Sequence, residues 1–258
     1  ELFLNTKHQE KSKLREFTFT SRTGLFMIVN RLYGIDVQER EHIEVWHEDV
    51  RFYDIFDTTG SLRGGFYLDL YARTGKRGGA WMDECIIRKK SASDVQTPIA
   101  YITCNFTPPI GNDPALLTHD EVITLFHEFG HGLHHMLTLV DYSSVSGVNG
   151  VPWDAVELPS QFMENWCWER EALALVGKHY QTGELISDDI FEKMIAGKNF
   201  QTSGLSVQSR MPWCQEDMMS RMWKMQPLKI IPFVVSMIPN AFNNILCHIF
   251  RVLYYKSE

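Results

Sequence analysis

Alternation of apolar and polar residues predicts strands between residues 62 and 106. Residues 66–71 and 99–104 each alternate, and residues 85–87 contain two β-branched isoleucines. The expected turns are marked by glycines, namely Gly60, Gly64, Gly65, Gly75, Gly78 and Gly79. The pattern therefore predicts a small, mostly antiparallel sheet in this part of the chain.

The periodicity then changes and predicts a helix from Thr118 to about Leu139. Thr118 and Glu121 have the spacing of a capping box, and acidic residues occupy the first turn, at the positive end of the helix dipole. Apolar residues then recur at helical intervals, at Val122, Leu125, Phe126, Phe129, Leu133, Met136 and Leu137. Gly130 and Gly132 each cost about 1 kcal/mol relative to alanine inside a helix. We therefore expect another backbone to pack close to them.

Further helices are predicted after a glycine-rich turn at 146–152. Residues 154–176 have helical spacing, with Pro159 in the first turn or at a kink. Residues 188–199 and 215–227 also favour helices. No linker-like stretch divides the chain, so we expect one domain over residues 1–258, of a mainly α (α+β) class with a small sheet.

Composition and charge narrow the range of possible functions and partners. The chain has 258 residues, with 44% hydrophobic and 22% charged residues, which is the balance of a soluble globular protein. The net charge is −7, and no basic run is longer than residues 88–90. Nucleic acid is therefore not an expected partner.

The cysteines and the apolar stretches indicate the compartment. The five cysteines are odd in number and have no C-x-x-C spacing, so neither a disulfide framework nor a zinc ribbon fits. Free thiols favour the reducing cytoplasm. The first residues lack the basic and apolar pattern of a secretory signal. Residues 230–250 are apolar but contain two prolines and three asparagines, so we expect a buried segment and no membrane span.

The predicted helix at 118–139 carries the candidate chemistry. His127, Glu128 and His131 form an H-E-x-x-H motif, and histidines at i and i+4 lie on one face of a helix. Imidazole and carboxylate ligands suit Zn²⁺, and Glu128 could act as the general base on a zinc-activated water. The motif also occurs by chance, and histidines are common in protein cores.

A third metal ligand must come from elsewhere in the chain. The metzincin pattern would require glycine at position 134 and histidine at position 137, where this chain has His134 and Leu137. A glutamate on a following helix is the other common solution, and Glu157 is the candidate. Asp154 or Glu164 could then orient a ligating imidazole, since each lies near the Glu157 face of the predicted helix.

The remaining histidines, tryptophans and methionines favour structural interpretations. We expect His119 in the first helical turn, and His134 and His135 on the helix surface or in packing. Three tryptophans are expected in the core: Trp153, Trp166 and Trp168. Five methionines resemble gap-filling residues: Met211, Met218, Met219, Met222 and Met225.

Long stretches of the sequence resemble the thimet oligopeptidase family of zinc metallopeptidases, in its oligopeptidase A branch. The resemblance covers about residues 24–201. It is carried by the stretches 45–52, 65–73, 76–82, 118–135 and 150–166. It implies His127, His131 and Glu157 as ligands of one zinc ion and Glu128 as the general base. It also implies a zincin-type, mostly helical fold with a small sheet, and a cytoplasmic endopeptidase that cleaves short oligopeptides.

Two departures from the family qualify this expectation. Family members have a helical half before this region, so the chain resembles a partial catalytic domain that could need that half. Residues 202–258 diverge, and no transition-state role can be assigned to His248, Tyr254 or Tyr255 there. A truncated or frame-shifted gene product is the resulting hypothesis. The alternative function is a catalytically impaired fragment that binds zinc or peptide only.

Overall fold

The computed structural model describes residues 17–19, 21–111, 114–153 and 155–202, and these residues form an α+β structure. The helices are α2 (Ser21–Tyr33), α3 (His119–Met136), α4 (Leu158–Asn165), α5 (Arg170–Val176) and α6 (Asp188–Thr202), with 3₁₀ turns η1 (Ser143–Val145) and η2 (Trp166–Trp168). The strands are β1 (Phe17–Phe19), β2 (Asp36–Glu39), β3 (Arg51–Phe56), β4 (Leu62–Tyr71), β5 (Trp81–Ile86), β6 (Lys89–Lys90), β7 (Val95–Gln96), β8 (Ile99–Phe106) and β9 (Gly177–His179). The predicted α+β class is confirmed, but the described residues form an α+β mix and not the mainly α fold that was expected.

Five of these strands form one sheet in the order β2-β3-β4-β8-β5. Only β4 and β8 pair in parallel, and the other three pairings are antiparallel, as predicted. Gly64 and Gly65 lie inside β4, so their assignment to a turn was wrong. A β-carbon on Gly65 would lie 2.6 Å from the ring of Phe52, which explains why the strand needs glycine there.

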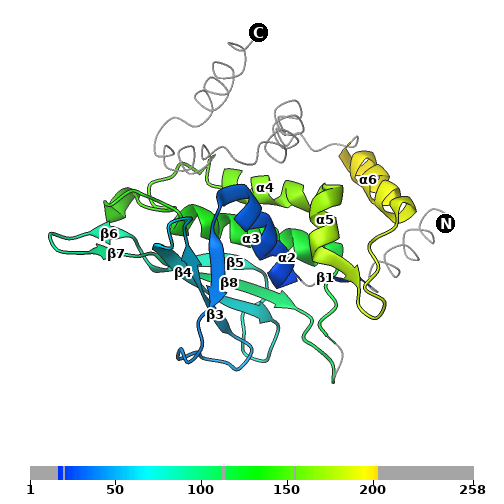
Figure 1. The fold of residues 1–258 in the computed structure, drawn as a ribbon, viewed down its shortest axis with the longest axis horizontal. Coiled ribbons are helices and arrows are strands. Elements are labelled where there is room, and N and C mark those ends of the chain that lie inside the picture. The colour runs from blue at the N-terminus through cyan, green and yellow to red at the C-terminus, as the bar shows by residue number, and fades with distance from the viewer. Residues whose placement is uncertain (1–16, 20, 112–113, 154, 203–258) are drawn as a thin grey trace, which may run out of the picture.

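The helices α2 to α5 lie together on one side of the sheet (Figure 1). Helix α3 packs along β8, β5 and β4, and its apolar face is buried as the periodicity predicts. Phe66 of β4 meets Phe129 of α3 edge to face, with ring centroids 5.3 Å apart. Burial of these rings fixes the position of the motif helix on the sheet.

The start of α3 follows the sequence signal closely. The Thr118 side chain accepts from the Glu121 N–H, and the Glu121 side chain accepts from the Thr118 N–H, so the predicted capping box is present. The helix ends at Met136 with Leu137 as its C-cap, slightly before the expected end. The motif therefore lies on a helix whose first turn is fixed by its own side chains.

The predicted helix at 154–176 is broken into three pieces, which corrects the expectation. Helix α4 begins only at Leu158, with Pro159 in its first turn as predicted, and η2 separates it from α5. The predicted helix at 188–199 corresponds to α6. Several expectations fall outside the described residues: the helix at 215–227, the apolar stretch 230–250 and the five methionines. Among the helices that the structure describes, none is long and apolar enough to cross a membrane.

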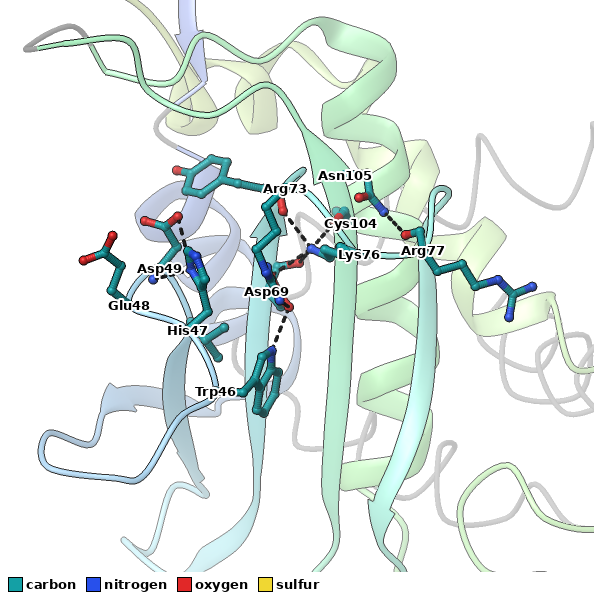
Figure 2. A network of polar contacts seen from close by, with 12 residues as sticks. Trp46, His47, Glu48, Asp49, Asp69, Arg73, Lys76, Arg77, Cys104 and Asn105 are labelled. Carbon is teal, nitrogen blue, oxygen red and sulfur yellow. Dashed lines mark hydrogen bonds and ion pairs between the residues drawn. The ribbon is translucent and has the colours of Figure 1, made fainter.

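A buried ion-pair network centred on Asp69 holds the loops on the opposite side of the sheet (Figure 2). Arg73 donates to both carboxylate oxygens at 2.7 and 2.8 Å, and Trp46 Nε1 donates to one of them at 3.1 Å. Lys76 Nζ lies 2.8 Å from the carboxylate and also donates to the Cys104 carbonyl at 2.5 Å. Asp69 therefore fixes the loops before β3 and after β4.

We expect the substitution Asp69→Asn to destabilise the protein, because it leaves Arg73 and Lys76 without their buried counter-charge. Breaking a buried ion pair on one side costs about 3–5 kcal/mol of unfolding free energy. Urea unfolding at pH 7 measures the difference. Asp189→Asn is the control, since its exposed pair with Lys193 contributes only about 0.3–0.5 kcal/mol.

The difference in unfolding free energy between the parent chain and Asp69→Asn should narrow at low pH. Burial raises the pKa of Asp69, but the hydrogen bonds from Arg73, Lys76 and Trp46 outweigh burial and lower the pKa to about 2. An unfolded aspartate has a pKa of about 3.9, so the stabilisation is complete above that pH and is lost as the pH falls toward 2. A difference that stayed constant down to this range would contradict the assigned role.

Candidate metal centre

The two motif histidines converge on one carboxylate. His127 Nε2 lies 3.2 Å from Glu157 Oε2, and His131 Nε2 lies 3.1 Å from the same oxygen. The two imidazole rings are nearly perpendicular, with centroids 4.9 Å apart. Among the described residues, these three are the group whose ligand atoms all lie within 4.8 Å of one another. The structure thus brings together the three residues predicted as metal ligands.

A close backbone contact places Glu157 there. A β-carbon on Gly130 would lie 2.6 Å from both Pro159 O and Ser160 Cα, so only glycine lets α4 approach α3 this closely. The predicted backbone approach is confirmed at Gly130. At Gly132 it was wrong, because the nearest atoms belong to the side chain of Ile102, at 3.0 Å.

Glu157 lies at the N-cap of α4, just before the helix, and its side chain is oriented locally. Ser160 Oγ donates to Glu157 Oε2 and to the Glu157 carbonyl, both at 2.8 Å. Ser160 is fully buried. Sequence reasoning missed this residue, although a serine three positions after the ligand glutamate was a usable signal.

Glu164 orients the first histidine. His127 Nδ1 lies 2.6 Å from Glu164 Oε1, and a carboxylate can only accept, so Nδ1 carries the proton. In the neutral ring, the lone pair of Nε2 then points toward Glu157. Glu164 was one of two residues predicted for this role; Asp154, the other, lies outside the described residues.

The donor set fits a divalent cation. With its proton on Nδ1, His127 presents a lone pair at Nε2 that faces the Glu157 carboxylate oxygen at 3.2 Å, and two acceptors at this distance repel unless a cation or proton lies between them. Four ligands at about 2.0–2.1 Å around a tetrahedral Zn²⁺ are separated by roughly 3.3 Å. The observed spacings of 3.1 and 3.2 Å are close to this value.

Glu128 lies beside this cluster and is nearly buried. The backbone N–H of Met82, in the edge strand β5, hydrogen-bonds its carboxylate. Burial raises the pKa of Glu128, as does the negative charge of Glu157, while His127 and the Met82 bond oppose the shift. Met82 is a second residue that sequence reasoning missed, because no local pattern connects it to the motif.

The surrounding charges act differently on the two histidines. Burial lowers the pKa of His127, but the bond with Glu164 and the charges of Glu128, Glu164 and Glu157 outweigh it and raise the pKa. At His131 burial dominates and the pKa is lowered, although Glu157 opposes the shift. Since metal ligands must be deprotonated, protons and a cation compete for this cluster.

The other predicted residues have structural roles, with one exception. His119 lies in the first turn of α3 and bonds the Cys167 carbonyl at 2.8 Å. His134 and His135 are buried in packing, and Trp166 is buried in the core. Trp153 is 94% exposed, so its prediction as a core residue was wrong.

The sequence matches one protein family over most of its length. A profile described as "Peptidase family M3" matches residues 4–218, beyond both ends of the stretch 24–201. The chain belongs to peptidase family M3.

Its relatives within this family carry oligopeptidase names. "Oligopeptidase A" from Escherichia coli (strain K12) is 61% identical over 181 residues, which are 70% of this chain and 27% of the relative. "Probable cytosolic oligopeptidase A" from Arabidopsis thaliana is 47% identical over 190 residues, 71% of this chain and 27% of the relative. "Thimet-like oligopeptidase" from Dictyostelium discoideum is 41% identical over 185 residues, 70% of this chain and 27% of the relative. The expected resemblance is confirmed, and this M3 chain spans about a quarter of the length of these relatives.

The close contact of α3 and α4 in this M3 chain can be tested by substituting Gly130. We expect Gly130→Ala to push α4 away, to cost about 1–3 kcal/mol through overpacking, and to weaken Zn²⁺ binding because Glu157 moves with α4. Urea unfolding and competition with a chromophoric zinc chelator measure the two effects. In α6, Gly197→Ala is the control, since nothing lies within 4 Å of its added β-carbon and alanine gains about 0.5–1 kcal/mol there. Unchanged stability and affinity in Gly130→Ala would refute the contact.

Proposed function

We propose that the chain carries the zinc site of a metallo-endopeptidase that hydrolyses short oligopeptides. The observation that supports this most strongly is the convergence of His127 Nε2 and His131 Nε2 on Glu157 Oε2, next to the carboxylate of Glu128. Two imidazoles and one carboxylate are the ligand set of thermolysin-type catalytic zinc sites, which leave a fourth position for water. A zincin-type catalytic region is therefore the finer fold assignment that we propose.

In this proposal, His127, His131 and Glu157 hold one Zn²⁺. When bound, the ion would supply Lewis acidity, lowering the pKa of a coordinated water to about 7 and polarising a carbonyl oxygen. Glu164 keeps the proton of His127 on Nδ1 and so presents the Nε2 lone pair to the ion. Ser160 holds the carboxylate of Glu157 in place.

Glu128 is the proposed general base. Its carboxylate accepts a proton from the attacking water and later returns it to the amine nitrogen of the leaving peptide. The Met82 N–H leaves acceptor capacity on the carboxylate, since a carboxylate has about four lone-pair sites. Strand β5 thereby holds the base beside the ligands.

The substrates and the compartment are part of the same proposal. The names of the relatives from Escherichia coli and Arabidopsis thaliana describe oligopeptidases, which supports short peptides as substrates. The word "cytosolic" in the name of one of them, together with the free thiols of Cys85, Cys104 and Cys167, supports a cytoplasmic location. Because the chain spans 27% of these relatives, the rest of the family fold is a proposed partner in forming the substrate channel.

Cleavage of a quenched-fluorescent short peptide tests the catalytic role. With zinc present we expect the parent chain to cleave the peptide, and we expect Glu128→Gln to reduce the rate by about 10²–10⁴-fold, because the proton acceptor is lost. The variant should still bind zinc, since Glu128 is not a ligand. No cleavage by a zinc-loaded parent chain would contradict peptide hydrolysis by this chain on its own, and equal cleavage by both proteins would remove Glu128 as the base.

Zinc affinity tests the ligand set separately from turnover. We expect Glu164→Gln to weaken Zn²⁺ binding by about 10–100-fold, the usual effect of losing a partner of a ligating histidine. Glu157→Gln should weaken it further, because a charged ligand is lost. Glu171→Gln is the matched control, since its side chain is 66% exposed and lies 3.9 Å from Arg31. Equal affinities in all three variants would exclude this site.

A further inference from the structure

A second polar cluster lies at the end of α3. His135 is fully buried, and its Nε2 donates to the Ile86 carbonyl at 2.9 Å. Its Nδ1 lies 3.2 Å from Glu84 Oε1 but forms no hydrogen bond with any described residue, so this contact is one of packing and charge. Asn149 Nδ2 donates to the same carboxylate oxygen at 2.6 Å. We refer to Glu84, His135 and Asn149 as the Glu84 cluster.

The Glu84 cluster joins three different segments. Glu84 belongs to the edge strand β5, His135 to the last turn of α3, and Asn149 to the loop 143–150. The loop backbone packs directly on the imidazole, because a β-carbon on Gly147, which has φ +65°, would lie 2.5 Å from His135 Nδ1. Asn149 also donates to the Ser146 carbonyl at 3.2 Å, which folds the loop onto itself.

The same three segments adjoin the proposed metal centre. Strand β5 supplies the Met82 N–H that bonds Glu128. Helix α3 carries His131 one turn before His135. The loop 143–150 leads to Glu157 through a turn in which Pro152 O accepts from the N–H groups of residues 155 and 156. The Glu84 cluster therefore connects three segments. These are the strand beside the proposed base Glu128, the helix that contains His131, and the loop that leads to Glu157.

The main effect of such a cluster is to hold the segments that it joins in a fixed geometry. The cost of desolvating a buried charge offsets much of the energy of its hydrogen bonds, so the net gain in stability is small. The hydrogen bonds from Asn149 to Glu84 and from His135 to the Ile86 carbonyl nevertheless restrict the groups that they join to one arrangement. The side chain of Glu84 is 23% exposed, and its carboxylate accepts from a loop that contributes no ligand of its own.

We propose that Glu84, through His135 and Asn149, is a positioning residue of the metal centre, holding β5 and the loop 143–150 at a fixed distance from α3. The inference rests on the proposed zinc site and adds a determinant of its geometry. Glu84 is not a catalytic residue, because it contacts neither the ligand atoms nor Glu128.

Metal binding by the full chain tests this role without measuring turnover. The variants are Asn149→Ala and Glu84→Ala, with Glu84→Gln as the conservative variant that still offers Asn149 an acceptor. Asn30→Ala is the matched control, since Asn30 Nδ2 donates to the Ile35 carbonyl at 2.9 Å and ties α2 to β2 instead. Zn²⁺ affinity is measured by chelator competition, the ligand geometry by the visible spectrum of bound Co²⁺, and folding by circular dichroism.

We expect Asn149→Ala and Glu84→Ala to remain folded, to bind Zn²⁺ about tenfold more weakly and to shift the Co²⁺ spectrum, as variants around ligand shells do. Glu84→Gln and Asn30→Ala should behave like the parent chain. Parent-like affinity and spectrum in both alanine variants would overturn the positioning role alone. An equal loss in Asn30→Ala would also overturn it, because general destabilisation would then explain the effect. Failure of the parent chain to bind Zn²⁺ would overturn the metal centre and the positioning role together.

Discussion

The backbone contact between α3 and α4 at Gly130 is the constraint on which the metal centre depends. A β-carbon there would lie 2.6 Å from backbone atoms of α4, so any larger residue would hold the helices apart. Helix α4 contains Glu164 and has Glu157 as its N-cap. The separation of the two helices therefore sets both carboxylate contacts of His127, at 3.2 and 2.6 Å. Gly130 weakens α3 as an isolated helix by about 1 kcal/mol. The same glycine allows the close approach of α4 that brings the proposed ligands together.

Charge explains why this arrangement suits a cation. Glu128, Glu157 and Glu164 surround two imidazoles, and without a cation their negative charges raise the pKa of His127. The charge of Glu157, together with burial, also raises the pKa of Glu128. A bound divalent cation reverses the local electrostatics, because it favours the neutral imidazole and the ionised carboxylate. In the proposed function, the ionised state of Glu128 that suits a general base would therefore depend on an ion held by the neighbouring residues.

The sequence predicted what depends on local spacing. The capping box at Thr118, the histidine pair and the glutamate partner of His127 all follow from positions within one or two helices. Contacts between remote segments could not be predicted in this way. Helix α2 was missed because Gly24 interrupts its pattern, yet a β-carbon there would lie 2.6 Å from the carbonyl of Leu175 in α5. Trp153 was placed wrongly, because the size of an apolar side chain does not reveal whether another segment covers it.

The same distinction separates metal binding from catalysis in this chain. The proposed ligands and the residue that orients His127 lie within residues 127–164, on α3, on α4 and at the N-cap of α4, so neighbouring segments supply the side chains of the candidate centre. A substrate channel has no such locality, since its walls come from any part of a fold, and this chain spans 27% of the length of its Escherichia coli relative. The proposed ligand cluster is thus the smallest unit of the proposed function that two neighbouring helices can form, so its metal binding can be measured separately from peptide cleavage.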